Sequence, residues 1–283
     1  MLKRLRQKHP IGYCVLAEVV FLVVLMLTSL LVTALLVIFC DDLSGVEDYL
    51  LTIIQEAAGV TAAVFFLKKT GEMELLRRRG SGFLNGLLVG MYPLLLIANS
   101  LFSKLVGELP EGPMRPAWRI ACFFIGMSMV GVAEEFLFRG VIAQTLLEHF
   151  GTSRAGIWKA CILSGLLFGA AHLPNMLGSA PFGVLMQCVF AASLGVMFAA
   201  IYYRTGNIWV TVFLHAAMDI GSMLIGGLYG TVTVADSVSS YDATMLLSVL
   251  IYILPTVFLL RKKKLGEVEL YFGKDTAGTD PIE

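Results

Sequence analysis

Residues 13–40 read "YCVLAEVVFLVVLMLTSLLVTALLVIFC", an apolar run whose one charged residue is Glu18. About 20 apolar residues are enough to cross the hydrocarbon core of a bilayer as a helix. The run is too long for a secretory signal, whose apolar core spans roughly 7 to 15 residues. We therefore expect a retained helix that spans a membrane.

The composition of the whole chain indicates a polytopic membrane protein. Of its 283 residues, 57% are hydrophobic and 15% are charged, and the mean hydropathy is +0.80. The net charge is zero, which gives no reason to expect nucleic acid as a partner. The five cysteines are scattered singly, without the spacing of a zinc site or a disulfide framework, and we interpret them as packing residues.

Hydropathy divides the chain into eight candidate spans. Long unbroken apolar runs favour helices over the short alternating strands of a membrane barrel. The predicted fold is therefore an all-α bundle of about eight transmembrane helices, in a multi-pass protein of the cell membrane. The candidate spans are residues 13–40, 49–67, 83–106, 118–142, 158–174, 181–203, 208–228 and 243–260.

The segments between the spans form two alternating sets that differ in charge. Cytoplasmic loops of membrane proteins are enriched in Lys and Arg. Every member of one set, the basic segments, contains Lys or Arg. In the other set, the opposite segments, Arg115 is the one Lys or Arg residue. Both termini are therefore predicted to be cytoplasmic. The basic segments are 1–12, 68–82, 143–157, 204–207 and 261–283, and the opposite segments are 41–48, 107–116, 173–180 and 229–242.

Six ionisable residues lie within the candidate spans and form one set. Asp, Lys or Arg at mid-helix costs about 2.5 to 3.5 kcal/mol to insert, so ionisable residues in spans are candidates for function. They are Glu134, Glu135 and Arg139 in the fourth span, His172 in the fifth, and His215 and Asp219 in the seventh.

Helical spacing assigns these residues to faces. Glu135 and Arg139 are four residues apart and can pair, whereas Glu134 points about 100° away from Glu135. His215 and Asp219 have the same spacing of four. We therefore expect Glu135 to be neutralised locally and Glu134 to be free.

The expected depths of the residues in the membrane agree less well. With a rise of about 1.5 Å per residue, Glu134 lies between the cytoplasmic end and the midplane, whereas His172 lies near the far end of its span. The two residues differ in depth by about 10 Å on this count. Sequence places span boundaries only to within several residues, so a shared cavity for Glu134 and His172 stays open despite this difference in depth.

The set suits the hydrolysis of an amide by water. A carboxylate removed from bulk water can act as a general base that takes a proton from a water molecule, the role that we assign to Glu134. One histidine can hold the same water or shuttle its proton, and a second can donate to a developing oxyanion. No Ser or Cys in a span has a base beside it in the sequence, so a covalent nucleophile has less support.

Two other interpretations of the same residues stay open. Glu134, His172 and His215 would supply the two-histidine, one-carboxylate set of catalytic zinc sites, although the HExxH spacing is absent. We expect no cofactor, with a divalent metal such as zinc as the alternative. The buried acids and bases could instead form two ion pairs that only fix helix packing.

Two further features have no assigned role in the chemistry. Glu56 lies within the second span without a partner that the sequence identifies. Pairs of small residues four apart predict close contacts between helices, and they occur at Gly86/Gly90, Gly165/Gly169 and Gly226/Gly230.

Three motifs resemble those of a known family. "EEFLFR" (134–139), "FGAAH" (168–172) and "HAAMD" (215–219) are similar, in order and rough separation, to the motifs of the CPBP family. This family, also called the Abi family, comprises membrane proteases related to CAAX prenyl endopeptidases and bacteriocin-processing enzymes. The resemblance covers about residues 118–225.

The resemblance implies an all-helical intramembrane endopeptidase of the glutamate type, with a cavity open toward the cytoplasm. A mechanism without metal is the favoured account for this family. The last position of the third motif is often Asn, whose amide can donate to an oxyanion, whereas Asp219 donates only when protonated. The matching residues are Glu134 and His172 for water activation, His215 and Asp219 for the oxyanion side, and Glu135 with Arg139 as the supporting pair.

These motifs divide the chain into three parts: three N-terminal helices (1–117), a catalytic core (118–228), and the last helix with a polar cytoplasmic tail (229–283). We expect a bacterial protein that acts in the lipid bilayer on a peptide or a membrane-tethered protein. One alternative is a non-catalytic scaffold or bacteriocin-immunity protein of the same fold. Another is a proton-coupled transporter, because buried acids and histidines also line ion paths.

Overall fold

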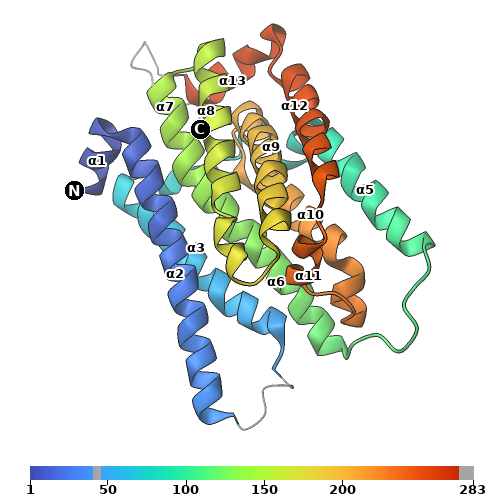
Figure 1. Cartoon of the computed structure of the whole chain (residues 1–283). Helices are drawn as coiled ribbons and strands as arrows, with labels where there is room; N and C mark the ends of the chain where they lie inside the picture. Colours follow the sequence, from blue (N-terminus) through green and yellow to red (C-terminus); the bar gives the residue numbers. More distant parts are fainter. Residues whose placement is uncertain (41–45, 274–283) are drawn as a thin grey trace.

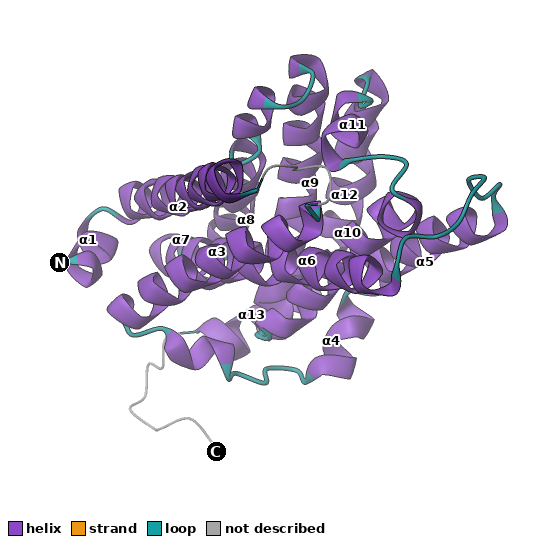
Figure 2. Cartoon of the chain, turned by 90° about the horizontal axis from the view of Figure 1, so that it is seen from below, coloured by secondary structure: helices purple, strands orange, loops and turns teal. Residues whose placement is uncertain are grey.

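Long helices run side by side through the molecule (Figure 1). A computed structural model describes residues 1–40 and 46–273, and all regular structure within these ranges is helical (Figure 2). The predicted all-α fold is thus confirmed. Parts of the first opposite segment (41–45) and of the polar tail (274–283) lie outside the described residues. The elements are α1 (Leu2–Lys8), α2 (Pro10–Phe39), α3 (Asp48–Thr70), η1 (Met73–Leu76), α4 (Phe83–Val89), α5 (Met91–Val106), α6 (Ala117–Glu135), η2 (Phe136–Ala143), α7 (Gln144–Phe150), α8 (Arg154–Ala170), η3 (Leu173–Leu177), α9 (Pro181–Thr205), α10 (Ile208–Tyr229), α11 (Val234–Ser239), η4 (Ala243–Leu246), α12 (Leu247–Leu259), η5 (Lys262–Lys264) and α13 (Leu265–Phe272).

Within the described residues, six helical units are long and apolar enough to cross a membrane. Two further candidates are bent pairs: α4 and α5 meet at 82°, and the segment from η4 to α12 meets the segment from η5 to α13 at 63°. The count reaches 8 if each bent pair is one span. The six units are α2, α3, Ala117–Phe150, Arg154–Leu177, α9 and α10.

The bend between α4 and α5 has a local cause. Gly90 separates the two helices, and a Cβ at this position would lie 2.6 Å from Cδ1 of Leu214 in α10. Pro93 lies in the first turn of α5, where a backbone N–H would have no partner within the helix. One helix therefore ends against α10, and the next begins there at a new angle.

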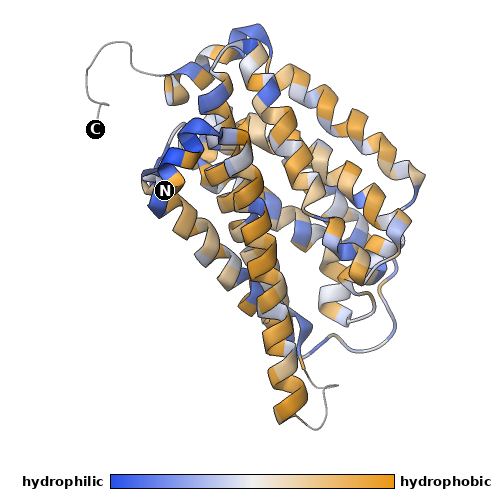
Figure 3. Ribbon diagram, turned by 60° about the vertical axis from the view of Figure 1, so that its left-hand side comes forward, coloured by the Kyte–Doolittle hydropathy of each residue, from blue (hydrophilic) through white to orange (hydrophobic). Residues whose placement is uncertain are grey.

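The outer surface is apolar where lipid would contact it. α2 is coloured as hydrophobic over most of its length in Figure 3. Its side chains Leu30, Ile38 and Phe39 are 64%, 69% and 79% exposed. Such a continuous apolar surface is unfavourable in water and is expected in a bilayer, where the helix satisfies its own backbone groups. The fold is that of a multi-pass membrane protein.

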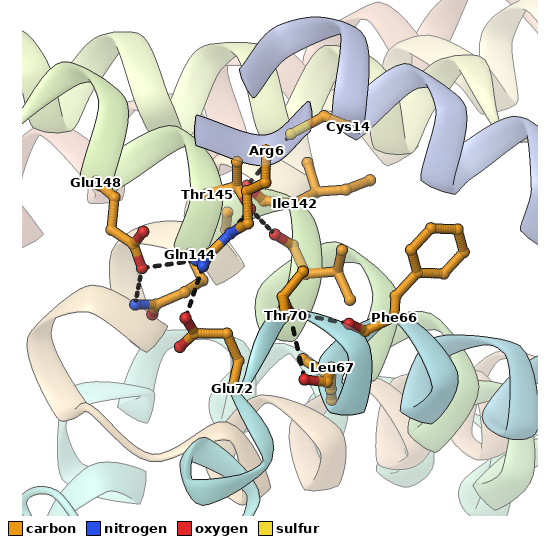
Figure 4. Close-up of polar contacts among 12 residues, drawn as sticks. Arg6, Cys14, Phe66, Leu67, Thr70, Glu72, Ile142, Gln144, Thr145 and Glu148 are labelled. Atoms are coloured by element: carbon orange, nitrogen blue, oxygen red, sulfur yellow. Dashed lines mark hydrogen bonds and ion pairs between the residues drawn. The ribbon is translucent and has the colours of Figure 1, made fainter. Parts of the chain in front are cut away.

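Three of the basic segments meet at one end of the bundle. Arg6 of α1 donates to the carboxylate of Glu72 at 2.6 Å and to that of Glu148 at 2.7 Å. Its Nε donates to Thr145 Oγ1 at 2.9 Å (Figure 4). These contacts join the segment that contains α1, the segment after α3, and α7.

The other two basic segments lie at the same end. Arg204, in the last turn of α9, pairs with Glu267 of α13 at 2.6 Å, and Lys264 pairs with the same side chain at 2.6 Å. The guanidinium of Arg78, beside η1, lies 5.2 Å from the ring centroid of Phe272 in α13. All five basic segments are thus connected, and we call this end of the bundle the basic end.

The opposite segments meet at the other end, which we call the opposite end. Arg115 donates to Glu47 Oε2 at 2.6 Å, and its backbone N–H donates to the carbonyl of Leu228 at 2.8 Å. The backbone N–H of Ala180 donates to Ser239 Oγ at 3.0 Å. The candidate spans therefore connect two ends in alternation, as the charge pattern requires. The assignment of the basic end to the cytoplasm stays a prediction.

The small-residue pairs prove to have different roles. A Cβ on Gly165 of α8 would lie 2.6 Å from the backbone oxygen of Ala192 in α9, so this pair marks a helix contact as predicted. The prediction for Gly226 and Gly230 was wrong. A Cβ on Gly226 would meet the carbonyl oxygen of Val232 in the following loop at 2.4 Å, and Gly230 ends α10 with a φ of 74°. This pair lets the chain turn back on its own helix.

We predict that Arg6→Met destabilises the protein. Arg6 is only 9% exposed and its loss leaves two carboxylates without their charged donor. The expected decrease in the free energy of unfolding is about 1–2 kcal/mol, below the full value for a charged hydrogen-bond network because solvent screens the partly exposed Glu148. The unfolding midpoint in detergent micelles measures it. Arg4→Met, at an exposed position of the same helix, should leave the midpoint unchanged, and an equal decrease in both variants would contradict the prediction.

Candidate active site

The first motif lies in the middle of one long helical unit. α6 ends at Glu135, the π-helical segment η2 follows directly and contains Arg139, and α7 continues to Phe150. The unit Ala117–Phe150 has 34 residues. The expected end of the fourth span at residue 142 was therefore wrong by eight residues, about 12 Å of helix. Hydropathy marks where the apolar run ends, whereas the helix continues into the polar residues of a basic segment.

This correction removes the depth mismatch between Glu134 and His172. The long unit and α8 are consecutive and are joined by the short turn between Phe150 and Arg154. Glu134 lies 16 residues before Phe150, and His172 lies 18 residues after Arg154, which is about 24 Å and about 27 Å along the two helices. The two residues are therefore nearly level, because both helices extend beyond the expected span ends at residues 142 and 158.

A cavity of about 360 Å³ brings the three motifs together. Glu134, His172, His215 and Asp219 all line it. Its walls come from α3, α6, α8 with η3, α9, α10 and α11. The four residues that the sequence assigned to chemistry thus share one space, while their individual roles stay predictions.

Glu135 joins two of the motifs beneath this cavity. Its Oε1 lies 2.9 Å from Arg139 Nη1 and 2.9 Å from His215 Nδ1. Glu135 and Arg139 are fully buried, and His215 is almost so. Because a carboxylate oxygen can only accept, the Nδ1 of His215 carries the hydrogen. The expected Glu135–Arg139 pair is present, and His215 is a further partner that helical spacing did not predict.

Aromatic rings enclose the Arg139 guanidinium. It lies 4.9 Å from the ring centroid of Phe168 and 5.3 Å from that of Phe198. The same two rings lie 5.6 Å and 5.7 Å from the imidazole of His215. Phe168 also meets His172 edge-on at 5.2 Å. Phe168 thus contacts residues of all three motifs. Its cation–π contact with the desolvated Arg139 contributes up to about 2 kcal/mol.

The second nitrogen of His215 lies between two carboxylates of the cavity. Its Nε2 is 3.6 Å from Glu134 Oε2 and 3.6 Å from Asp219 Oδ2. These distances are too long for hydrogen bonds but short for charge interactions. The side chain of Glu134 is 21% exposed, whereas that of Glu135 is fully buried. Glu134 is therefore the carboxylate that faces the cavity, as the helical spacing predicted.

His172 follows the last turn of α8 and has one nitrogen engaged. Its Nδ1 lies 2.8 Å from the carbonyl oxygen of Phe168, which can only accept, so Nδ1 carries the hydrogen. In the neutral ring, Nε2 then has a free lone pair. A nitrogen of this kind can hold a water molecule or accept its proton.

Glu56 is a cavity residue that the sequence left unassigned. It lies on α3, is 7% exposed, and its Oε2 has no hydrogen-bond partner among the described residues. Asn175 donates to Gln187 at 2.9 Å in another part of the lining. The cavity therefore extends beyond the expected core of residues 118–228. The only sequence signal for Glu56 was that an acidic residue lies within a span. Its place in the cavity depends on the packing of α3 against α6, which the local sequence does not show.

These side chains do not form a metal site in the observed geometry. Within residues 1–40 and 46–273, no three His, Cys, Asp or Glu side chains are arranged to hold one ion. The alternative set of Glu134, His172 and His215 shares the cavity but does not fit such a site.

The cavity extends from the middle of the bundle toward the opposite end. Its lining includes η3 and α11, which belong to the opposite segments. The resemblance implied a cavity open toward the cytoplasm, and the charge pattern places the basic end in the cytoplasm. The geometry does not allow both expectations to hold.

Comparison with known proteins finds similarity over the part of the chain that carries the three motifs. Residues 116–221 match the family described as type II CAAX prenyl endopeptidase Rce1-like. This segment carries all three motifs, and the expected family resemblance is confirmed over it: residues 116–221 form an Rce1-like segment. A stretch of 101 residues is 29% identical to "Putative membrane peptidase YdiL" of Bacillus subtilis (strain 168), and covers 35% of this chain and 35% of that relative. The match thus spans about a third of the relative's length, and the printed descriptions of the family and of the relative both name a peptidase.

We predict that the two adjacent glutamates differ in their effect on stability. Glu135→Gln leaves the fully buried Arg139 without its counter-charge, so we expect a decrease of about 3–5 kcal/mol in the free energy of unfolding. Glu134→Gln removes a charge that makes no hydrogen bond to Arg139 and should change stability by less than about 1 kcal/mol. Unfolding of both variants in detergent micelles measures the difference. Equal losses would show that the two carboxylates share the structural role.

A second prediction concerns the crossing of α6 and α10 beside the site. A Cβ on Gly131 would lie 2.9 Å from the backbone N and 3.0 Å from the Cβ of Ala216, next to His215. Gly131→Ala should therefore push the helices apart and destabilise the protein by about 1–3 kcal/mol. Gly266→Ala, on α13 with open space at its Cβ position, is the matched control and should be neutral or slightly stabilising. A neutral Gly131→Ala variant would disprove the close crossing.

Proposed function

We propose that the protein is an intramembrane endopeptidase of the cell membrane that hydrolyses peptide bonds of membrane-associated peptides or proteins. The observation that carries the proposal is one cavity that holds Glu134, His172, His215 and Asp219, while the adjacent Glu135 is engaged in a buried pair. The Rce1-like segment at residues 116–221 supports the same conclusion.

In this proposal Glu134 and His172 activate water. The Glu134 carboxylate accepts a proton from a water molecule that His172 Nε2 helps to hold, and the water oxygen forms a bond to the substrate carbonyl carbon. The carbonyl π electrons move to the oxygen, which gives a tetrahedral oxyanion. Glu134 then returns the proton to the amide nitrogen as the C–N bond breaks, so one water is consumed and an acid and an amine leave.

His215 and Asp219 form the oxyanion side. Glu135 accepts from Nδ1 of His215 and thereby fixes the ring, so that Nε2 is the nitrogen directed toward the cavity residues. Nε2 can donate to the oxyanion when the ring is doubly protonated. Asp219 either orients this ring as a carboxylate or, when protonated, donates to the oxyanion itself. Each step uses groups of the chain and water, and no cofactor enters the mechanism.

The two alternatives differ in their support. A proton-coupled transporter needs polar groups along a path through the membrane, whereas Glu56, Glu134, His172, His215 and Asp219 line one cavity. A scaffold or immunity protein of the same fold needs no free carboxylate in a cavity, and activity measurements separate it from a peptidase.

We predict that Glu134→Gln lowers the rate of peptide cleavage by about 10²- to 10⁴-fold, the usual contribution of a general base. Purified wild-type and variant proteins in liposomes, offered a library of quenched peptides, measure the rate. Metal content is determined on the same samples, so that loss of activity without stoichiometric metal supports direct activation of water. Glu111→Gln, on an exposed loop, is the matched control and should cleave at the wild-type rate. Unchanged cleavage by Glu134→Gln would overturn the proposed base, and no cleavage by any protein would favour the scaffold.

A further inference from the structure

Most of the elements that line the active-site cavity contribute residues near the opposite end. On α3 the lining residues are 52–56, just after the helix starts at the opposite end. On α9 they are 187–194, in the half that follows the opposite segment 173–180. On α10 they are 215–223, around the middle of the helix, and Glu134 likewise lies at the middle of the unit Ala117–Phe150. The cavity therefore extends from the catalytic groups toward the opposite end.

A segment of the opposite end forms the outer wall of the cavity. Val234, Ser237 and Val238 of α11, together with Tyr241, line it. α11 is seated closely on α9, because a Cβ on Gly183 would lie 2.2 Å from the carbonyl oxygen of Val238. A segment of the opposite end therefore borders the cavity on that side.

The molecule is filled between the catalytic groups and the basic end. Leu137, Ile142 and Tyr203 are completely buried there. The Tyr203 hydroxyl donates to the carbonyl of Ala143 at 2.7 Å, and beyond it lies the polar network of Arg6 (Figure 4). Packed side chains therefore fill this part of the described structure.

The basic end has a cavity of its own. It measures about 570 Å³ and is lined by α1, α7 and the end of α13, among other segments. It shares no lining residue with the active-site cavity. The two cavities are therefore distinct, and the catalytic groups line the one that extends toward the opposite end.

We infer that the catalytic groups face the extracytoplasmic side of the membrane, and that the substrate is an extended peptide segment on that side. The inference rests on the proposed function for its substrate. Its sidedness rests on the charge pattern, because all five basic segments gather at the end that the cavity does not reach, and Lys- and Arg-rich loops stay in the cytoplasm. The expectation of a cavity open toward the cytoplasm is the one of the two conflicting expectations that is set aside.

The chemistry of the lining suits such a substrate. Amide and hydroxyl side chains surround the catalytic groups and can hydrogen-bond the backbone of an extended peptide. Exported peptides and the juxtamembrane segments of membrane-tethered proteins provide chains of this kind at the outer surface. The amide, serine and threonine side chains of the lining are Thr52, Gln55, Asn175, Gln187, Ser222 and Ser237, and Tyr241 adds a phenolic hydroxyl.

Cysteine labelling on intact cells tests the sidedness without any activity. The probe is a membrane-impermeant maleimide sulfonate, and the signal is the increase over the unsubstituted chain with its five cysteines. Ser237→Cys in the cavity wall and Glu111→Cys, exposed at the same end, should label on intact cells. Gly266→Cys, exposed at the basic end, should label only after permeabilisation. The reverse pattern would overturn the inference.

A vesicle assay then tests the substrate. The full chain is reconstituted in one orientation, verified by labelling of Gly266→Cys, and a quenched peptide is supplied either outside or enclosed in the lumen. We expect cleavage when the peptide shares a compartment with Ser237, and loss of cleavage when it shares one with Gly266. Cleavage in detergent but only from the compartment of Gly266 would overturn the inference and leave the peptidase intact. No cleavage even in detergent would overturn the proposed function, and the labelling result would still decide the sidedness.

Discussion

The site depends on one fully buried ion pair, Glu135 with Arg139, at a separation of 2.9 Å. A charge in this position is tolerable only when a partner of opposite charge lies beside it. The same Glu135 oxygen holds His215, and the Arg139 guanidinium lies between Phe168 and Phe198. Helices α8, α9 and α10 thereby contact one charged centre on the unit Ala117–Phe150, and this centre positions the catalytic candidates.

A second constraint is the continuity of Ala117–Phe150. The π-helical segment η2 begins immediately after Glu135, in the middle of this unit. Insertions of this kind widen a helix locally and often occur at functional sites. Here the wider turn carries Arg139 on a helix that also reaches the network of Arg6 at the basic end. One helix therefore connects the chemistry with the polar surface that closes the other half of the molecule.

Much of the fold was predictable because a bilayer imposes strong rules on a chain. Apolar runs marked the spans, and the charges of the loops assigned each loop to one of two ends. In the structure Arg6 and Arg204 join segments of the basic end, and Arg115 joins segments of the opposite end. The helix extends beyond the expected span end at residue 142, because hydropathy marks the end of the apolar run and not the end of the helix. Glu56 and Phe168 were missed as site residues because their roles depend on contacts between helices distant in sequence.

The sequence alone determined the class of fold, the three motifs and the pairing of Glu135 with Arg139, because hydropathy and a spacing of four residues are local properties. Only the tertiary structure decided that Glu134 and His172 are nearly level, that His215 binds Glu135, and that the cavity extends away from the basic end. These facts depend on how helices far apart in the chain pack and on where each one ends. Local patterns in a sequence carry neither quantity.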